Sequence, residues 1–116
     1  MKLFDKDLVA KLVDAHNSKT SENPAIVAKV RNVYGPGSFY LIDGFIDEAN
    51  NKKLVVRGIT DIDFSGEKSF LDEPVETTLF AEDFETFNIP YGRVHFDIDN
   101  IFSGKLEDAI KALKHE

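Results

Sequence analysis

The sequence predicts an α+β fold, in which an antiparallel sheet of four to five strands carries N- and C-terminal helices and a short third helix, packed mainly on one face. Three observations lead to this class. Residues 38–64 alternate in the manner of a long β-hairpin, amphipathic helical patterns stand near both ends, and the expected elements follow in the order α-β-β-β-(β)-α-β-α with hairpin connections. The 116 residues suit one core, so residues 1–116 are treated as a single domain.

The first expected element is a helix over residues 6–16. Asp5 stands at the position of an N-cap, and an apolar stripe follows at helical spacing, made of Leu8, Val9, Leu12 and Val13. His16 comes at the carboxyl end, where the helix dipole favours a cation, so we interpret it as structural.

A strand is expected at residues 25–33, followed by the hairpin at 38–64. The second strand of the hairpin places its even-numbered residues, from Leu54 to Phe64, on an apolar face and Arg57 on a polar one. The first strand is apolar on both faces, with Tyr40, Ile42 and Ile46 on one side and Phe39, Leu41 and Phe45 on the other. This pattern predicts a central strand. The Asn-rich connection at 47–52 tolerates left-handed backbone, which favours a hairpin turn.

The second half is predicted as an acidic loop at 65–76 and a short strand at 77–80, followed by a helical turn or two at 81–87. A last strand is expected at 93–99, with Val94, Phe96 and Ile98 pointing inward. The final helix is expected at 104–114, with Ser103 as its N-cap and a stripe made of Leu106, Ala109, Ile110 and Leu113.

The net charge of −7 is unevenly distributed. Residues 61–99 hold eleven Asp and Glu against two Lys and Arg, whereas residues 1–60 hold seven against nine. The acidic third repels phosphate and attracts basic surfaces, so direct nucleic-acid binding is disfavoured. The alternative left open is that these carboxylates only keep a small domain soluble.

Cysteine is absent, so disulfides and thiolate metal sites are excluded. The amino-terminal residues contain acidic side chains and no uninterrupted apolar run, so we expect no signal peptide, no membrane span and a cytoplasmic location. Nucleotide-binding and nucleophile-elbow motifs do not occur, and the sequence implies no cofactor.

One metal-binding pattern stands out on the last predicted strand. Strand alternation places His95, Asp97 and Asp99 on one face, where an imidazole and two carboxylates suit a divalent cation. If Asp61 and Asp63 came from a neighbouring strand, four carboxylates would converge on a metal-dependent hydrolase site. The competing interpretation is that these residues form a solvated strand face and pair with Lys29, Arg31, Arg57 and Arg93.

Several landmarks along the chain resemble a small uncharacterised domain family of bacterial plasmids and phages. They are the leading helix, the strand at 25–33 with its Gly/Pro turn, the Phe39-Tyr40 pair, Gly58, the Leu79-Phe80, Glu82, Phe84 and Glu85 pattern, and the Ile89-Pro90, Arg93 and Phe96 pattern. The resemblance implies a mobile-element origin, and it supplies no functional residues because the family has no settled activity.

The sequence therefore favours a non-enzymatic, acidic protein-interaction module, an inhibitor or accessory factor that acts on a basic or nucleic-acid-handling partner. The predicted binding residues lie in the 61–99 region and are Asp61, Asp63, Phe70, Leu71, Asp72, Glu73, Glu76, Glu82, Asp83 and Glu85. The alternative is the hydrolase with its His-x-Asp-x-Asp strand.

Overall fold

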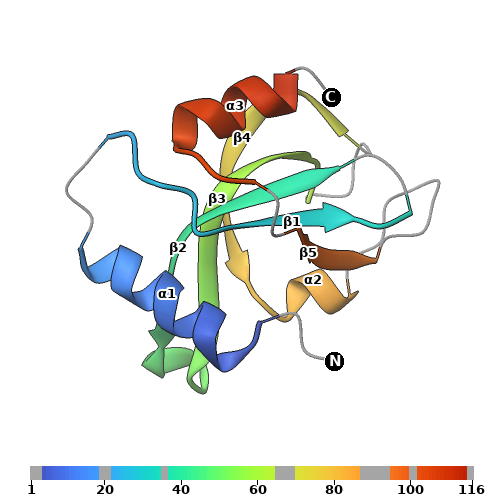
Figure 1. The fold of residues 1–116 in the computed structure, drawn as a ribbon. Coiled ribbons are helices and arrows are strands. Elements are labelled where there is room, and N and C mark those ends of the chain that lie inside the picture. Colours follow the sequence, from blue (N-terminus) through green and yellow to red (C-terminus); the bar gives the residue numbers. More distant parts are fainter. Residues whose placement is uncertain are drawn as a thin grey trace.

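The computed structural model describes residues 4–18, 22–34, 37–64, 70–86, 95–99 and 102–114. They form an α+β fold around a five-stranded antiparallel sheet in the order β4-β3-β2-β1-β5, which confirms the predicted class (Figure 1). The elements in chain order are α1 (Lys6–Asn17), β1 (Ala28–Asn32), β2 (Ser38–Asp47), η1 (Glu48–Asn50), β3 (Lys53–Ile62), β4 (Phe70–Phe80), α2 (Asp83–Thr86), β5 (Phe96–Asp99) and α3 (Leu106–Lys114).

The predicted hairpin is confirmed as β2 and β3, which pair antiparallel along most of their length. In the connection, Asn51 and Lys52 adopt left-handed backbone with φ of 58° and 59°. The Asp47 carboxylate accepts hydrogen bonds from the Ala49 amide and the Asn50 side chain. As predicted, β2 is central, because β3 and β1 flank it in the sheet.

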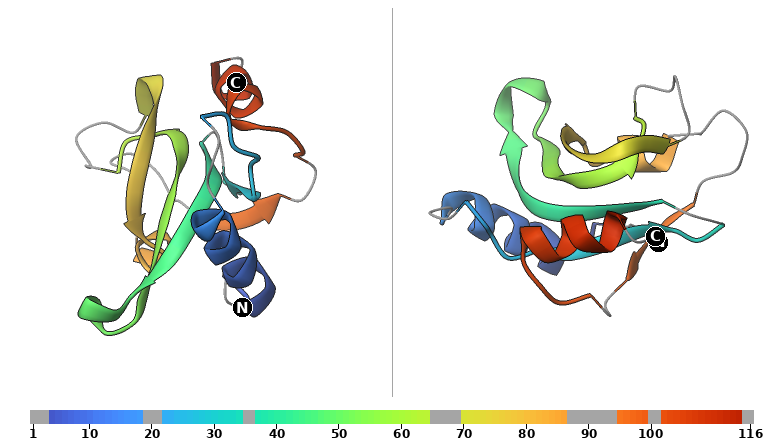
Figure 2. Two further views of the ribbon diagram at one scale, coloured as in Figure 1. Left: turned by 90° about the vertical axis from the view of Figure 1, so that its left-hand side faces the viewer. Right: turned by 90° about the horizontal axis from the view of Figure 1, so that it is seen from above.

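The sheet has two buried faces. Phe39, Leu41 and Val56 face Leu12 of α1 and Phe84 of α2, and this side is called the α1 face. On the other side, called the α3 face, Tyr40 of β2 and Ile59 of β3 pack against Ala109 and Leu113 of α3. Figures 1 and 2 show α1 and α3 on opposite sides of the central strands.

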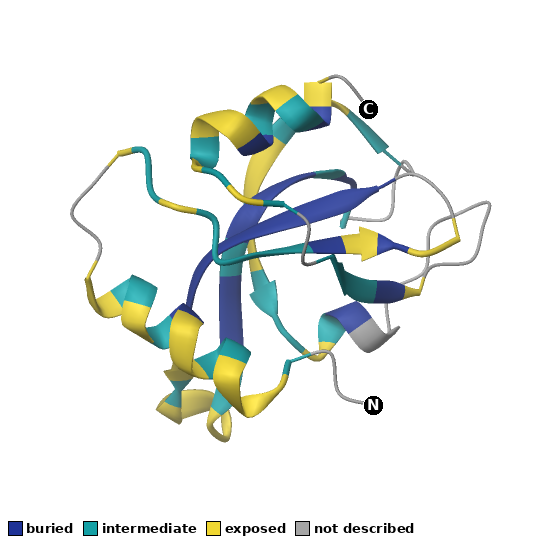
Figure 3. Ribbon diagram, in the orientation of Figure 1, coloured by how far each residue is buried: buried dark blue, intermediate teal, exposed yellow. Residues whose placement is uncertain are grey.

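The prediction that the helices pack mainly on one face is therefore wrong. Consecutive residues of β2, from Phe39 to Ile42, are at most 2% exposed, so both sides of this strand need a covering layer. Figure 3 shows the buried centre of the sheet between the two helices, whose outer sides are exposed.

A β-bulge in β2 alters the predicted alternation. The pairing with β3 shifts between Leu41 and Asp43, and Asp43 stands opposite Arg57. The extra residue reverses the sides of everything that follows, so Phe45 lies on the α3 face and Ile46 on the α1 face, contrary to prediction.

The strand β4 is longer than predicted. It spans Phe70–Phe80, although the sequence suggested a loop through residue 76. Its pairing with β3 is interrupted between Thr60 and Ile62, and resumes where Ile62 stands opposite Phe70. This irregular stretch contains Asp72, Glu73 and Pro74, and it explains why the strand shows no period-two pattern. Residues 65–69 lie outside the described chain.

Three other elements differ from expectation. In place of the short third helix at 81–87 there is a single helical turn, Asp83–Thr86, in which Phe84 is buried; Phe87 lies outside the described residues. The strand β1 is shorter than predicted, and Ala25 forms an isolated bridge with Lys105. The last strand is described from Phe96 onward, so its expected start at 93 and 94 is outside the described chain.

The two terminal helices differ in how their first turns are capped. The Asp5 carboxylate accepts from the Leu8 amide at 2.8 Å, which confirms the predicted N-cap of α1. In contrast, α3 starts later than predicted, and Asn23 Oδ1 accepts from the Glu107 amide at 3.0 Å. A tertiary contact therefore replaces the predicted Ser103 cap. None of the described helices is long and apolar enough to cross a bilayer.

Candidate functional site

Half of the predicted binding residues lie on β4, at one edge of the sheet. This strand has β3 on one side and no further strand on the other among the described residues. Asp72, Glu73 and Glu76 are exposed along it, while Phe70 and Leu71 are partly buried. The structure thus brings five of the ten predicted residues onto one edge strand.

The edge of β4 divides into two parts. The first contains Pro74 within the irregular pairing, and both features discourage the addition of another strand. The second part, residues 75–80, pairs regularly with β3 and contains no Pro, Gly or Lys. The outer side of residues 75–80 therefore presents a regular row of backbone donors and acceptors.

Three of the predicted binding carboxylates, Glu73, Glu76 and Glu82, contact cations. Lys114 Nζ lies 3.8 Å from Glu73 Oε2, Lys53 Nζ lies 2.8 Å from Glu82 Oε1, and Arg57 Nη1 donates to Glu76. The carboxylate side chains are 54% to 76% exposed, so these pairs contribute little to stability and stay within reach of a partner.

The Glu82 contact changes the titration of its partner. The hydrogen bond that Lys53 donates to Glu82 raises the pKa of Lys53 above its usual value of 10.5. The negative charge of Glu82 is the next largest cause, and Asp83 makes a smaller contribution in the same direction. Asp83 itself is partly buried beside Glu82, and the side chain of Glu85 lies outside what the structure describes.

Asp61 and Asp63 are placed differently from the other predicted residues. Asp61 Oδ1 accepts from the Ser38 amide at 3.3 Å and holds the start of β2 against β3. Asp63 is only 6% exposed. Both carboxylates are thus held at the β3 end of the hairpin and do not join the exposed row on β4.

The residues predicted to bind a metal on the last strand have cations as strand neighbours. Asp97 and Asp99 share one face of β5, as predicted, but their strand neighbours are the cations Arg31 and Lys29 of β1. Lys29 Nζ lies 3.9 Å from Asp99 Oδ2 and 5.3 Å from the centre of the Tyr40 ring. Lys29 thus pairs with Asp99 as the competing interpretation expects, but the two side chains are only 19% and 17% exposed, so this face is not fully solvated.

Asp61 and Asp63 do not come from a strand next to β5, because β2 and β1 separate β3 from β5, so the condition for four converging carboxylates is not met. The part of the chain that the structure describes holds no group of three or more metal-ligating side chains. The ring of His95, the residue before β5, lies 6.1 Å from that of Tyr34.

Sequence reasoning missed a buried ion pair on the α3 face. Asp43, whose side chain is 3% exposed, accepts from Arg57 Nε at 3.0 Å and from Nη2 at 2.7 Å. This hydrogen bonding raises the pKa of Arg57 beyond its usual range. His16 Nδ1 lies 3.9 Å from the same carboxylate, and its ring lies 5.1 Å from that of Phe45. The sequence does contain a signal for this ion pair, because Asp43 stands within an otherwise apolar strand.

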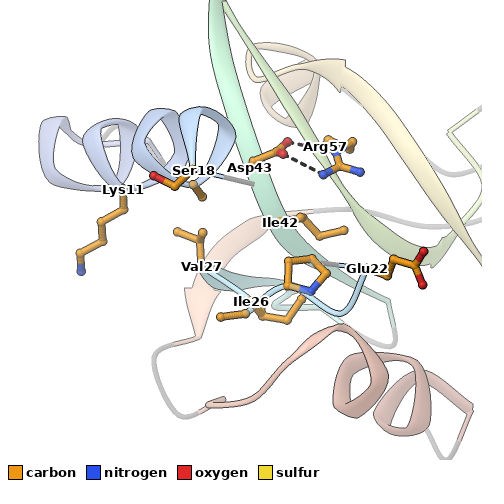
Figure 4. A pocket seen from close by; sticks show the side chains of 11 residues that line it. Lys11, Ser18, Glu22, Ile26, Val27, Ile42, Asp43 and Arg57 are labelled. Carbon is orange, nitrogen blue, oxygen red and sulfur yellow. Dashed lines mark hydrogen bonds and ion pairs between the residues drawn. The ribbon is translucent and has the colours of Figure 1, made fainter. Parts of the chain in front are cut away.

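The Asp43–Arg57 pair lines a cavity of about 820 Å³ between α1, residues 22–27 and the central strands. Figure 4 shows the aliphatic side chains of Ile26, Val27 and Ile42 gathered near this pair. A smaller cavity of about 140 Å³, lined by His16 and Thr78 among others, shares the same two charged residues.

Comparisons with protein-family models, with curated proteins and with solved structures found no match to this chain. The resemblance to the plasmid and phage domain family thus rests on the sequence landmarks alone.

Proposed function

We propose that this chain is a non-enzymatic protein-interaction module that binds an extended, basic segment of another protein along the outer edge of β4. The observation that carries the proposal is the combination of an eleven-residue edge strand and the exposed carboxylates Asp72, Glu73 and Glu76 on it. Main-chain hydrogen bonds to residues 75–80 would supply affinity, and side chains would supply specificity.

The pleat of β4 defines the sequence pattern of a suitable partner. Glu76 and Thr78 point to the α3 face, because they stand opposite Ile59 and Arg57, whereas Val75 lies on the α1 face with Thr60. An added strand would therefore place every second side chain beside Glu76. We expect Lys or Arg at those positions and β-branched residues between them.

The charge distribution supports a basic partner rather than a nucleic acid. The 61–99 region has an excess of nine carboxylates over cations by formal count, which attracts cations at long range and repels phosphate. A role as inhibitor or accessory factor for a nucleic-acid-handling protein fits this charge, because such proteins carry basic surfaces.

The test uses two synthetic peptides of equal composition, one with alternating Lys and Val and one with the lysines in a block. We expect the alternating peptide to bind, with shifts in amide NMR signals confined to β4 and β3. Reversing Glu73 and Glu76 to Lys should weaken binding about tenfold or more, as for loss of close charge pairs.

The matched control reverses Asp14 and Glu48 to Lys, which changes the net charge equally at exposed sites away from β4. This control should bind within about twofold of the parent at physiological salt, where distant charges are screened. Equal binding of the blocked peptide, or equal weakening in both charge-reversed proteins, would show that only nonspecific charge is involved. Co-purification from the native host at low salt would then identify the natural partner.

A further inference from the structure

The cavity beside α1 lies apart from the outer edge of β4, although Arg57, which lines the cavity, also donates to Glu76 of β4. Its volume of about 820 Å³ falls within the range of about 300 to 1,000 Å³ usual for small-molecule sites. Most of its wall is aliphatic, and comes from α1, from residues 22–27 and from the bulge of β2; the residues are Ala15, Pro24, Ala25, Ile26, Val27 and Ile42.

The charges around the cavity cancel. Its described lining contains two cations, Lys11 and Arg57, and two carboxylates, Glu22 and Asp43. Lys11 and Glu22 lie on opposite sides of the cavity in Figure 4. Since neither sign prevails, an ionic ligand would lose its hydration without a matching counter-charge.

The Asp43–Arg57 pair offers hydrogen-bond donors rather than acceptors. Both oxygens of Asp43 accept from Arg57, and this carboxylate is almost fully enclosed. A guanidinium has five N–H groups. Arg57 donates three hydrogen bonds to Asp43 and Glu76, so two of its N–H groups have no bond among the described residues. Asp43 thus fixes the orientation of a donor whose side chain is 32% exposed.

We infer that this cavity binds an uncharged small molecule with an apolar body and a carbonyl or hydroxyl oxygen that accepts a hydrogen bond from Arg57. The aliphatic wall accounts for the body, the balanced charges for the absence of net charge, and the oriented guanidinium for the acceptor. The described lining of this cavity contains no residue of β4, so the cavity is a different site from the proposed peptide-binding edge.

Three probes with one aromatic body test the class of ligand: 2-acetylnaphthalene, 2-naphthoate and 2-naphthylmethylamine. Titration into the full chain, followed by amide NMR, should show 2-acetylnaphthalene shifting signals of Ala15, Ile26, Val27 and Ile42. The two charged probes should bind about tenfold more weakly or worse.

The variant Ala15→Leu places a larger side chain in the cavity wall, and Ala10→Leu makes the same change on an exposed part of that helix. Binding of 2-acetylnaphthalene should weaken about tenfold or more in Ala15→Leu and stay unchanged in Ala10→Leu, with both proteins folded by their amide spectra. Equal binding by the two variants, or charged probes that bind as tightly as the ketone, would overturn the inference.

Discussion

Replacing Arg57 with methionine removes the cation from a buried carboxylate. Asp43 is 3% exposed in its side chain and receives two hydrogen bonds from Arg57, at 3.0 Å and 2.7 Å. Breaking such a pair from one side costs about 3–5 kcal/mol, because an uncompensated charge remains in a poorly solvated place. With a urea slope of about 2 kcal/mol per M, the unfolding midpoint should fall by about 2 M.

Two further variants separate this effect from the general loss of an ion pair. Glu76→Gln removes the exposed partner of Arg57, 54% exposed in its side chain, and should cost about 1 kcal/mol or less. The double variant Asp43→Leu with Arg57→Met should recover most of the loss, because it removes both charges. Urea unfolding at neutral pH measures all three. If Arg57→Met costs no more than Glu76→Gln, the buried pair does not have the importance assigned to it.

Three other predictions concern the hairpin and its surroundings. A methyl group at Gly58 would lie 2.3 Å from Cε1 of Phe39, so Gly58→Ala should destabilise the domain by about 3 kcal/mol or more in a thermal melt; a change under about 1 kcal/mol would contradict the described packing. Lys52 holds a φ of 59°, so Lys52→Gly should stabilise by about 0.5–1 kcal/mol, and a loss of stability in urea would contradict a strained turn. Because Glu82 raises the pKa of Lys53, the stability from this pair should be fully present below pH 10.5 and decline as pH rises through the folded pKa. Glu82→Gln should remove this decline from alkaline melts, and an unchanged profile would contradict the assignment.

The strand residues show how far local pattern leads and where it stops. The period-two alternation of β3 correctly placed Val56 and Ile62 on one buried face, because a pleated strand alternates sides wherever it is regular. In β2 the bulge beside Asp43 broke that rule. A bulge adds a residue opposite a partner strand, so its position depends on pairing that the sequence of one strand does not encode.

For the candidate site, too, local sequence predicted one part and the tertiary structure decided the rest. Composition identified the acidic third of the chain, but the strand order decided that Asp72, Glu73 and Glu76 lie on an edge strand. It also decided that Asp61 and Asp97 are kept apart by β2 and β1. The cavity beside α1 was not predictable, since it joins residues from four separate segments, such as Ala15, Val27, Ile42 and Arg57.

The sequence by itself determined the α+β class, the central hairpin and the Asp5 cap of the first helix. Each depends on residues within one turn or two adjacent strands, where side-chain period and capping chemistry act locally. Only the tertiary structure decided which face each helix covers, which strand forms the edge, and that Arg57 is the partner of Asp43. Those outcomes depend on the simultaneous burial of both faces of β2, a property of the assembled layers rather than of any single segment.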